Sequence, residues 1–218
     1  MLTFNNRLRG LMMKRFILAI IPLLGAGLTA CGSGGTTTNN YYPDDCNAPT
    51  FNSMTGLQLL NSWGEGLQAY NSAIYGDVGV ESSAAFFTMS FYTADAVLLP
   101  TVSFVQREGT QEIYSYFTHF LVRNPIMSLP DPESNVFMQL GCGYGGASGY
   151  YNFVINPGTV NESTVNARFT FVYKYESQTF TESAVIESGP MMGQTVSQIN
   201  LPGWYIDTQQ SSILPPNP

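Results

Sequence analysis

Beyond residue 135 the chain consists almost entirely of segments with the composition of β-strands. These segments are rich in β-branched and aromatic residues, which favour extended backbone. They cover residues 136–140, 149–155, 164–175, 179–186, 195–199 and 203–212. Asn156-Pro157-Gly158 is typical of a turn between two of them. Such closely spaced strands predict a meander and leave little room for helices in this half of the chain.

The residues before this region predict helices. Apolar side chains recur at helical spacing between 50 and 75, residues 80–89 predict a second short helix, and residues 110–122 a third. Residues 94–99 predict a strand, which 102–105 either continue or pair with. Helices followed by a meander predict an α+β fold, with the helices on one face of an antiparallel sheet.

The first thirty residues have the pattern of a targeting segment. Lys14 and Arg15 precede an apolar run over residues 16–28. That run is shorter than the roughly 20 apolar residues that a spanning helix needs. Leu28-Thr29-Ala30-Cys31 resembles the lipobox of bacterial lipoproteins, in which the cysteine is acylated. We therefore expect residues 1–30 to be a lipoprotein signal peptide with its start at Met13; the alternative is an ordinary secretory signal.

The residues after Cys31 predict how the protein is tethered. Residues 31–48 are polar and rich in Gly and Asn, so they cannot bury a core and predict a flexible tether. Acyl chains on Cys31 would anchor the protein in a lipid bilayer. If the source is Gram-negative, Gly32 resembles the residue after the lipidated cysteine that sorts lipoproteins to the outer membrane, and the chain would face the periplasm. Residues 49–218 are long enough for one folded domain.

The charge balance argues against nucleic acid as a partner. Without the signal peptide, four basic residues remain against fifteen acidic ones, a formal charge of −11. A surface of this sign repels a phosphate backbone. We expect no nucleic-acid partner.

Two cysteines remain after Cys31, namely Cys46 and Cys142. An exported domain lies where disulfides persist, and an even pair there is most simply a disulfide. Metal binding is the alternative, but two thiols alone do not make a zinc site, which needs four ligands. A disulfide would join the end of the tether to the folded domain.

Four segments carry a family resemblance. They are Tyr92–Ser103 (YTADAVLLPTVS), Tyr116–Leu121 (YFTHFL), Ala167–Tyr173 (ARFTFVY) and Trp204–Pro215 (WYIDTQQSSILP). Together they resemble the association domain of calcium/calmodulin-dependent protein kinase II and its bacterial relatives. The resemblance implies a nuclear transport factor 2-like cone: a curved antiparallel sheet packed on N-terminal helices, with a pocket in its mouth. It also implies a homo-oligomer formed through the open face of the sheet.

The departures from this family concern its ionisable groups. Gln209 and Gln210 stand where the family has two histidines, and Ala147 stands where it has an aspartate. Residues 174–203 replace a short hairpin and could form an additional one. Glutamine forms hydrogen bonds but does not exchange protons near neutral pH. The loss of both histidines favours a binding or assembly module over an enzyme.

Arg168 is the leading candidate for ligand binding. It lies in an apolar strand, and an inward-facing guanidinium needs a partner. It would either hold an acidic ligand or peptide at the pocket floor, as the resemblance implies, or pair with an acid such as Asp95. Arg107 matches a recurrent family arginine but could also be a solvated loop charge. The predicted ligand-binding set is Arg168, Arg107, Gln209, Gln210 and Tyr151.

The sequence predicts no metal site, no cofactor and no catalytic residue. His119 is the only histidine, so no second imidazole is present for a dyad or metal site. The expected function is an envelope lipoprotein whose domain binds a ligand, oligomerises, or does both. The alternative is a SnoaL-like cyclase or isomerase, in which Asp95 would act as the base beside a tyrosine in an apolar pocket.

Overall fold

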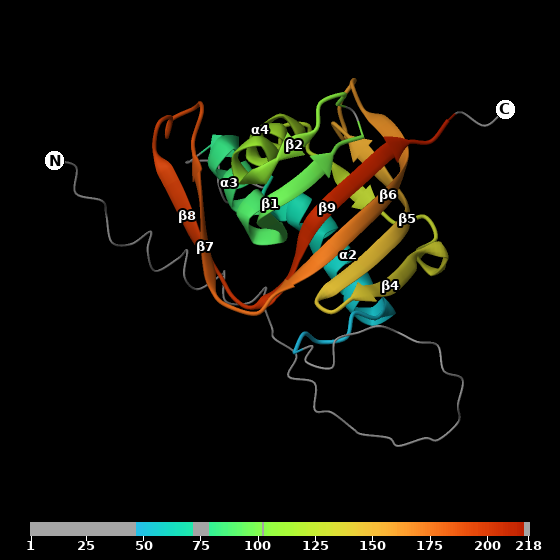
Figure 1. Cartoon of the computed structure of the whole chain (residues 1–218). Helices are drawn as coiled ribbons and strands as arrows, with labels where there is room; N and C mark the ends of the chain where they lie inside the picture. Colours follow the sequence, from blue (N-terminus) through green and yellow to red (C-terminus); the bar gives the residue numbers. More distant parts are fainter. Residues whose placement is uncertain (1–46, 72–78, 102, 216–218) are drawn as a thin grey trace, which may run out of the picture. The chain divides into compact units, whose positions relative to one another are not determined.

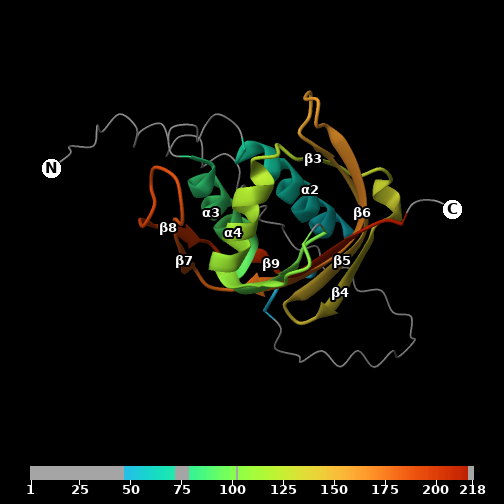
Figure 2. The same ribbon diagram turned by 90° about the horizontal axis from the view of Figure 1, so that it is seen from above.

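A computed structural model describes residues 47–71, 79–101 and 103–215. Its main element is a seven-stranded sheet with the order β2-β1-β9-β6-β5-β3, in which β4 also pairs with β5. The strands are β1 (Tyr92–Leu99), β2 (Arg107–Glu108), β3 (Ile126–Ser128), β4 (Val136–Gly141), β5 (Tyr144–Ile155), β6 (Ser163–Glu176) and β9 (Gly203–Ile213). Every pairing is antiparallel except that of β1 with β9, which is parallel. The sheet is strongly curved (Figures 1 and 2).

Three helices pack on one face of this sheet (Figure 2). They are α2 (Ser53–Ala69), α3 (Gly79–Phe91) and α4 (Gly109–Leu121). Asn52 caps α2 by accepting a hydrogen bond from the Thr55 amide at 2.9 Å. Helices α2 and α4 each bury one stripe, as the spacing of their apolar residues predicts. Helix α3 is buried on most sides, at residues 82–85 and 87–89. In the described ranges, none of the helices has the length and apolar character needed to cross a membrane.

Residues 174–203 form the additional hairpin, β7 (Phe180–Val185) paired with β8 (Thr195–Asn200). The hairpin lies beside α3 and α4 (Figure 1). Gln111 of α4 accepts from the Val185 amide at 3.0 Å, and Asn200 donates to the Met89 carbonyl of α3 at 2.8 Å. The insert therefore covers two helices that the main sheet leaves open on this side.

The core lies between the curved sheet and the helices and is largely aromatic. Trp63 of α2 contacts Phe87, Tyr151, Phe153 and Phe171, with ring centroids 5.3 to 6.4 Å apart. Another core ring, Phe51, packs directly against the backbone of Gly145. A Cβ on Gly145 would lie 2.1 Å from Phe51 Cγ, so only glycine fits there.

The structure confirms the predicted α+β class and corrects three details. Residues 103–105 are not a strand; the partner of β1 is instead the short β2. The sheet is not wholly antiparallel, because β9 returns beside β1 in the same direction. The short edge strand β3 was not predicted. The expected signal peptide, Cys31 and all but the last two residues of the tether lie outside the described residues.

Candidate functional site

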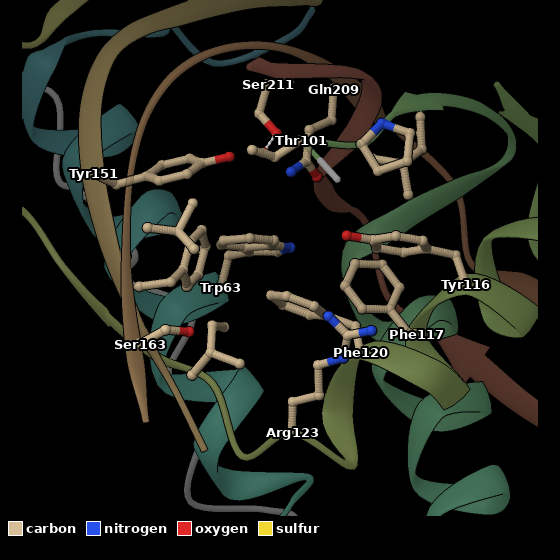
Figure 3. Close-up of a pocket in the computed structure, with 15 residues that line it drawn as sticks. Trp63, Thr101, Tyr116, Phe117, Phe120, Arg123, Tyr151, Ser163, Gln209 and Ser211 are labelled. Carbon is tan, nitrogen blue, oxygen red and sulfur yellow. Dashed lines mark hydrogen bonds between the residues drawn. The ribbon is translucent and has the colours of Figure 1, made fainter. Parts of the chain in front are cut away.

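A cavity of about 80 Å³ lies between the sheet, α2 and α4 (Figure 3). This volume exceeds by several-fold the roughly 15 Å³ that one water needs on the same measure. Aromatic and aliphatic side chains form most of its wall, and a few polar groups point into it. The lining residues are Trp63, Leu98, Pro100, Thr101, Tyr116, Phe117, Phe120, Arg123, Tyr151, Phe153, Ile155, Ser163, Val165, Gln209 and Ser211.

One end of the cavity is polar and uncharged. The hydroxyls of Thr101 and Ser211 are hydrogen-bonded to each other, and the Tyr151 hydroxyl points toward them (Figure 3). Burial raises the pKa of Tyr151 to about 12, although hydrogen bonds from Ser211, Thr101 and Gln209 favour its anion. Tyr151 therefore stays protonated at neutral pH and presents a neutral hydroxyl.

Gln209 belongs to a chain of three buried side chains at the same end. Trp63 Nε1 donates to the Tyr92 hydroxyl at 3.0 Å. The Tyr92 hydroxyl donates in turn to Gln209 Oε1. Tyr92 is 1% exposed, and burial raises its pKa well above its ordinary value, so it remains a donor. The carboxamide of Gln209 thus has a partner on its oxygen side.

Arg123 forms part of the opposite wall. Tyr116 points its hydroxyl into the cavity, and Arg123 lies beyond Phe120 (Figure 3). Burial raises the pKa of Tyr116, while the charges of Arg123 and Arg107 lower it. Arg123 is exposed and forms no ion pair with any described residue. An acidic group entering past Phe120 would meet this guanidinium.

Strand geometry decides which of the two glutamines reaches the cavity. Neighbouring residues on a strand point to opposite faces. Gln209 is 4% exposed and lines the cavity, whereas Gln210 is exposed on the outer face opposite Thr170. Tyr151 has the same inward orientation. Of the predicted ligand-binding set, Gln209 and Tyr151 line the cavity and Gln210 does not.

The expectation that Arg168 lies at the pocket floor is wrong. Its neighbours Ala167 and Phe169 are buried, so strand alternation places Arg168 on the outer face, where it is exposed. There Arg168 Nε donates to Ser212 Oγ at 2.8 Å. The alternative ion pair with Asp95 is not formed either.

Arg107 and Asp95 also lie outside the cavity wall. Arg107 is half-buried, and its Nε has no hydrogen-bond partner among the described residues. Asp95 is exposed on β1, so the proposed catalytic base does not face the cavity. Among the described residues no acidic side chain lines the cavity. The arrangement can bind through neutral hydrogen bonds and a nearby cation, but it provides no carboxylate base.

Several lining residues were not recognised as a site from the sequence. Thr101 and Ser211 lie far apart in the chain and meet because β1 and β9 run in parallel, with Leu99 opposite Gln210. Both lie in segments that carry the family resemblance, which was the available signal. Arg123 follows the end of α4 and lies outside the segments that carry the family resemblance, so the sequence did not indicate it.

The comparisons with known proteins agree with this fold. No family model matches the chain, and no curated protein matches it. A candidate calcium/calmodulin-dependent protein kinase II association domain from Xanthomonas campestris is similar in structure. It has 23% identity and a TM-score of 0.50 over 81% of this chain and 99% of that chain. This similarity supports the nuclear transport factor 2-like cone.

Two other solved structures have lower scores. A nuclear transport factor 2-like protein with a cystatin-like fold from Novosphingobium aromaticivorans has 10% identity and a TM-score of 0.44, over 73% of this chain and 80% of that chain. An iota-carbonic anhydrase from a cyanobacterium, complexed with bicarbonate, has 13% identity and a TM-score of 0.46, over 78% of this chain and 99% of that chain.

Proposed function

We propose that this chain is an envelope lipoprotein whose folded domain binds a small acidic ligand in the cavity. The observation that carries the ligand proposal is the cavity itself, an apolar space that has neutral hydrogen-bonding groups at one end. Arg123, exposed and without an ion pair among the described residues, takes the place of Arg168 as the cation for an acidic ligand. The absence of an acid from the described lining favours binding over acid–base catalysis.

Filling the cavity tests this proposal. Val165→Trp places an indole in the cavity from β6, whereas Thr164→Trp places one on the exposed face of the same strand. Short-chain carboxylates such as butyrate and hexanoate should bind the full-length protein and the Thr164→Trp control in ligand-observed NMR. Binding should be lost in Val165→Trp. Equal binding by all three proteins would place the ligand elsewhere.

The membrane anchor is proposed from the sequence alone. Cys31 would carry the acyl chains and Cys46 would pair with Cys142, which lies in the turn between β4 and β5. Cys31→Ala should move the protein from the membrane fraction to the soluble fraction and abolish incorporation of labelled palmitate. A thiol count on intact and reduced protein tests the disulfide.

Assembly with a second copy of the chain is a second function that one observation favours. Val136, Met138 and Leu140 of β4 and Tyr150 of β5 are each between 46 and 49% exposed on the outer face of the sheet. The similar Xanthomonas protein is described as an association domain. We propose a homo-oligomer formed through this face. Light scattering after size-exclusion chromatography should show it, and Met138→Glu should dissociate it.

A further inference from the structure

The direction of each hydrogen bond at the polar end of the cavity determines what that end can recognise. Hydroxyl groups adapt, because each can donate or accept. Thr101, Ser211 and Tyr151 therefore set no fixed preference. The Gln209 carboxamide differs, since its oxygen only accepts and its nitrogen only donates. Its orientation decides which of the two faces a ligand.

The chain from Trp63 to Gln209 fixes this orientation. The indole N–H of Trp63 only donates, so the Tyr92 oxygen must accept from it. The Tyr92 proton then needs an acceptor, and Gln209 Oε1 provides one. If the carboxamide rotated by 180°, the Tyr92 hydroxyl would face an NH₂ group. Its proton would then be buried without an acceptor, which costs roughly 1–3 kcal/mol.

The surroundings of Tyr151 agree with this orientation. Gln209 is among the side chains whose hydrogen bonds favour the Tyr151 anion, as a donor does. The Gln209 nitrogen lies on the cavity side of the carboxamide, toward Tyr151 (Figure 3). One N–H can face the Tyr151 oxygen and the other can face the cavity.

We infer that Tyr92, oriented by Trp63, is a positioning residue that holds the N–H groups of Gln209 toward the cavity, so that this end selects a ligand oxygen that accepts hydrogen bonds. The inference rests on the proposed function, because it concerns the same cavity. The inference specifies the chemistry of the ligand group that meets Gln209. This group is a carbonyl or carboxylate oxygen and not a group that can only donate a hydrogen bond. Neither Tyr92 nor Trp63 need touch the ligand through its polar atom.

Two neutral probes of similar size test the inference without involving the arginines. Cyclopentanone presents only an acceptor, and pyrrole presents only an N–H donor. Ligand-observed NMR titration of the full-length protein should give a preference of about tenfold for cyclopentanone, the size expected when one buried polar group is left unpaired. Tyr92→Phe frees the carboxamide to rotate and should bring the two affinities within about twofold.

Gln209→Met provides a second variant should Tyr92→Phe fold poorly. It removes the carboxamide at similar length and should also abolish the preference. Tyr173→Phe is the matched control: Tyr173 is a buried tyrosine of β6 outside the lining, so this variant should retain the tenfold ratio. A tenfold preference that persists in Tyr92→Phe and Gln209→Met would overturn the inference and leave cavity binding intact. Failure of the wild type to bind either probe, or a preference for pyrrole, would also overturn it. Absence of butyrate and hexanoate binding to the wild type would instead contradict the proposed function.

Discussion

The cavity and the underside of the β7–β8 hairpin both bury polar groups, but they treat them differently. At the polar end of the cavity, the Trp63 N–H and the Tyr92 hydroxyl each meet an acceptor, the second of them on Gln209. Beneath the hairpin, Glu182 is 3% exposed and neither carboxyl oxygen has a hydrogen-bond partner among the described residues. One region therefore pairs neutral groups, and the other buries an unpaired ionisable group.

Because of this difference, the cavity suits ligand recognition, whereas the hairpin should respond to pH. Paired neutral groups keep a fixed hydrogen-bonding pattern across the physiological pH range, which suits a binding site. Burial without a hydrogen-bond partner disfavours the charged form of a carboxyl group, so the protonated form is favoured. The hairpin is thus the part of the described domain whose docking should depend on pH.

The largest predicted effect is the pH dependence caused by Glu182. Burial raises its pKa from 4.5 to about 8, and the charges of Asp95 and Glu176 add to this; the nearby Thr110 hydroxyl, which does not reach hydrogen-bond geometry, opposes it. The folded chain then holds a proton that the unfolded chain releases between these two pH values. Stability therefore falls as the pH rises through this window and levels off above about 8. Between pH 5 and 8 the loss should be on the order of 3 kcal/mol in urea unfolding.

Glu182→Gln separates this effect from the titration of all other groups. The variant cannot ionise, so its stability advantage over the wild type should grow as the pH rises. Tyr205 also faces Glu182, and burial raises its pKa to about 12, so it stays neutral in this window. Parallel pH profiles for the two proteins would show that Glu182 is solvated or paired in solution.

The next effect compares two buried tyrosines. Tyr92→Phe leaves Gln209 Oε1 without its donor and Trp63 Nε1 without its acceptor, and should cost about 2 kcal/mol of unfolding free energy. The Tyr173 hydroxyl is buried without a hydrogen-bond partner among the described residues. Tyr173→Phe removes a group that is desolvated but unpaired, so it should be neutral or stabilise by up to about 1 kcal/mol. Equal costs in urea unfolding would contradict this comparison.

The fold could be predicted further than the site. Strand and helix segments are continuous in the chain, so composition and spacing indicated most of them, including the extra hairpin. The parallel β1–β9 pairing was missed because it joins segments more than 100 residues apart, and no local pattern encodes it. The strand β3 was missed because three residues carry too little pattern.

The site depended on which face each side chain takes. Arg168 was expected inward because its strand is aromatic, but alternation with Ala167 and Phe169 turns it outward. The alternation was readable from the sequence; which face was buried required the positions of the helices. The Tyr92–Gln209 contact is tertiary and could not be inferred from either segment alone.

A smaller effect concerns the attachment of the hairpin to α4. Gln111 donates to the Val185 carbonyl at 2.9 Å and accepts from the Val185 amide at 3.0 Å. Gln111→Leu should cost about 1 kcal/mol and accelerate hydrogen exchange at the Val185 amide several-fold, because the edge of β7 loses its partner. Gln106→Leu is the control, since Gln106 is exposed and, among the described residues, its side chain bonds only to Glu108. Equal exchange in both variants would show that packing alone holds the hairpin.

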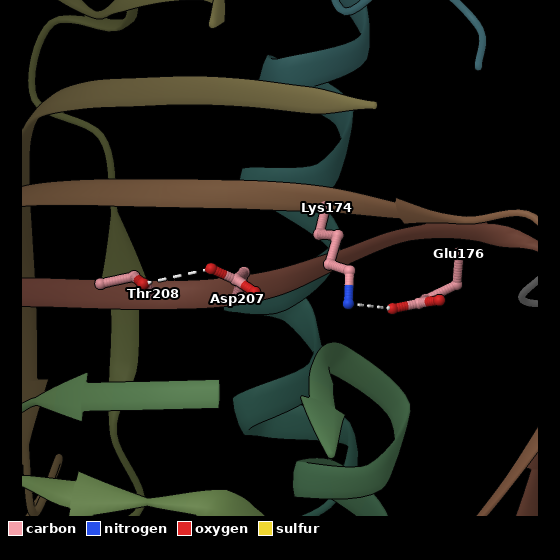
Figure 4. Close-up of polar contacts among 4 residues, drawn as sticks. All are labelled: Lys174, Glu176, Asp207 and Thr208. Atoms are coloured by element: carbon pink, nitrogen blue, oxygen red, sulfur yellow. Dashed lines mark hydrogen bonds and ion pairs between the residues drawn. The ribbon is translucent and has the colours of Figure 1, made fainter. Parts of the chain in front are cut away.

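The smallest effect belongs to the ion pair between Lys174 and Glu176, where β6 leaves the main sheet (Figure 4). Their side chains are about 30% exposed, and Lys174 Nζ lies 2.9 Å from the Glu176 carboxylate. A double-mutant cycle with Lys174→Met and Glu176→Gln should give a coupling of about 0.5 kcal/mol that disappears in about 1 M NaCl. A larger coupling that resists salt would mean that the pair is less solvated than its exposure indicates.

Glu176 also connects this pair to the buried acid. Its charge contributes to the raised pKa of Glu182, so Glu176→Gln should move the pH window of instability slightly downward. Lys174→Met leaves the Glu176 charge in place and should not move the window in that direction. The two variants thus break the same exposed pair but differ in their effect on the hairpin. A downward shift in both, read from urea unfolding between pH 5 and 8, would show that the window does not depend on the charge of Glu176.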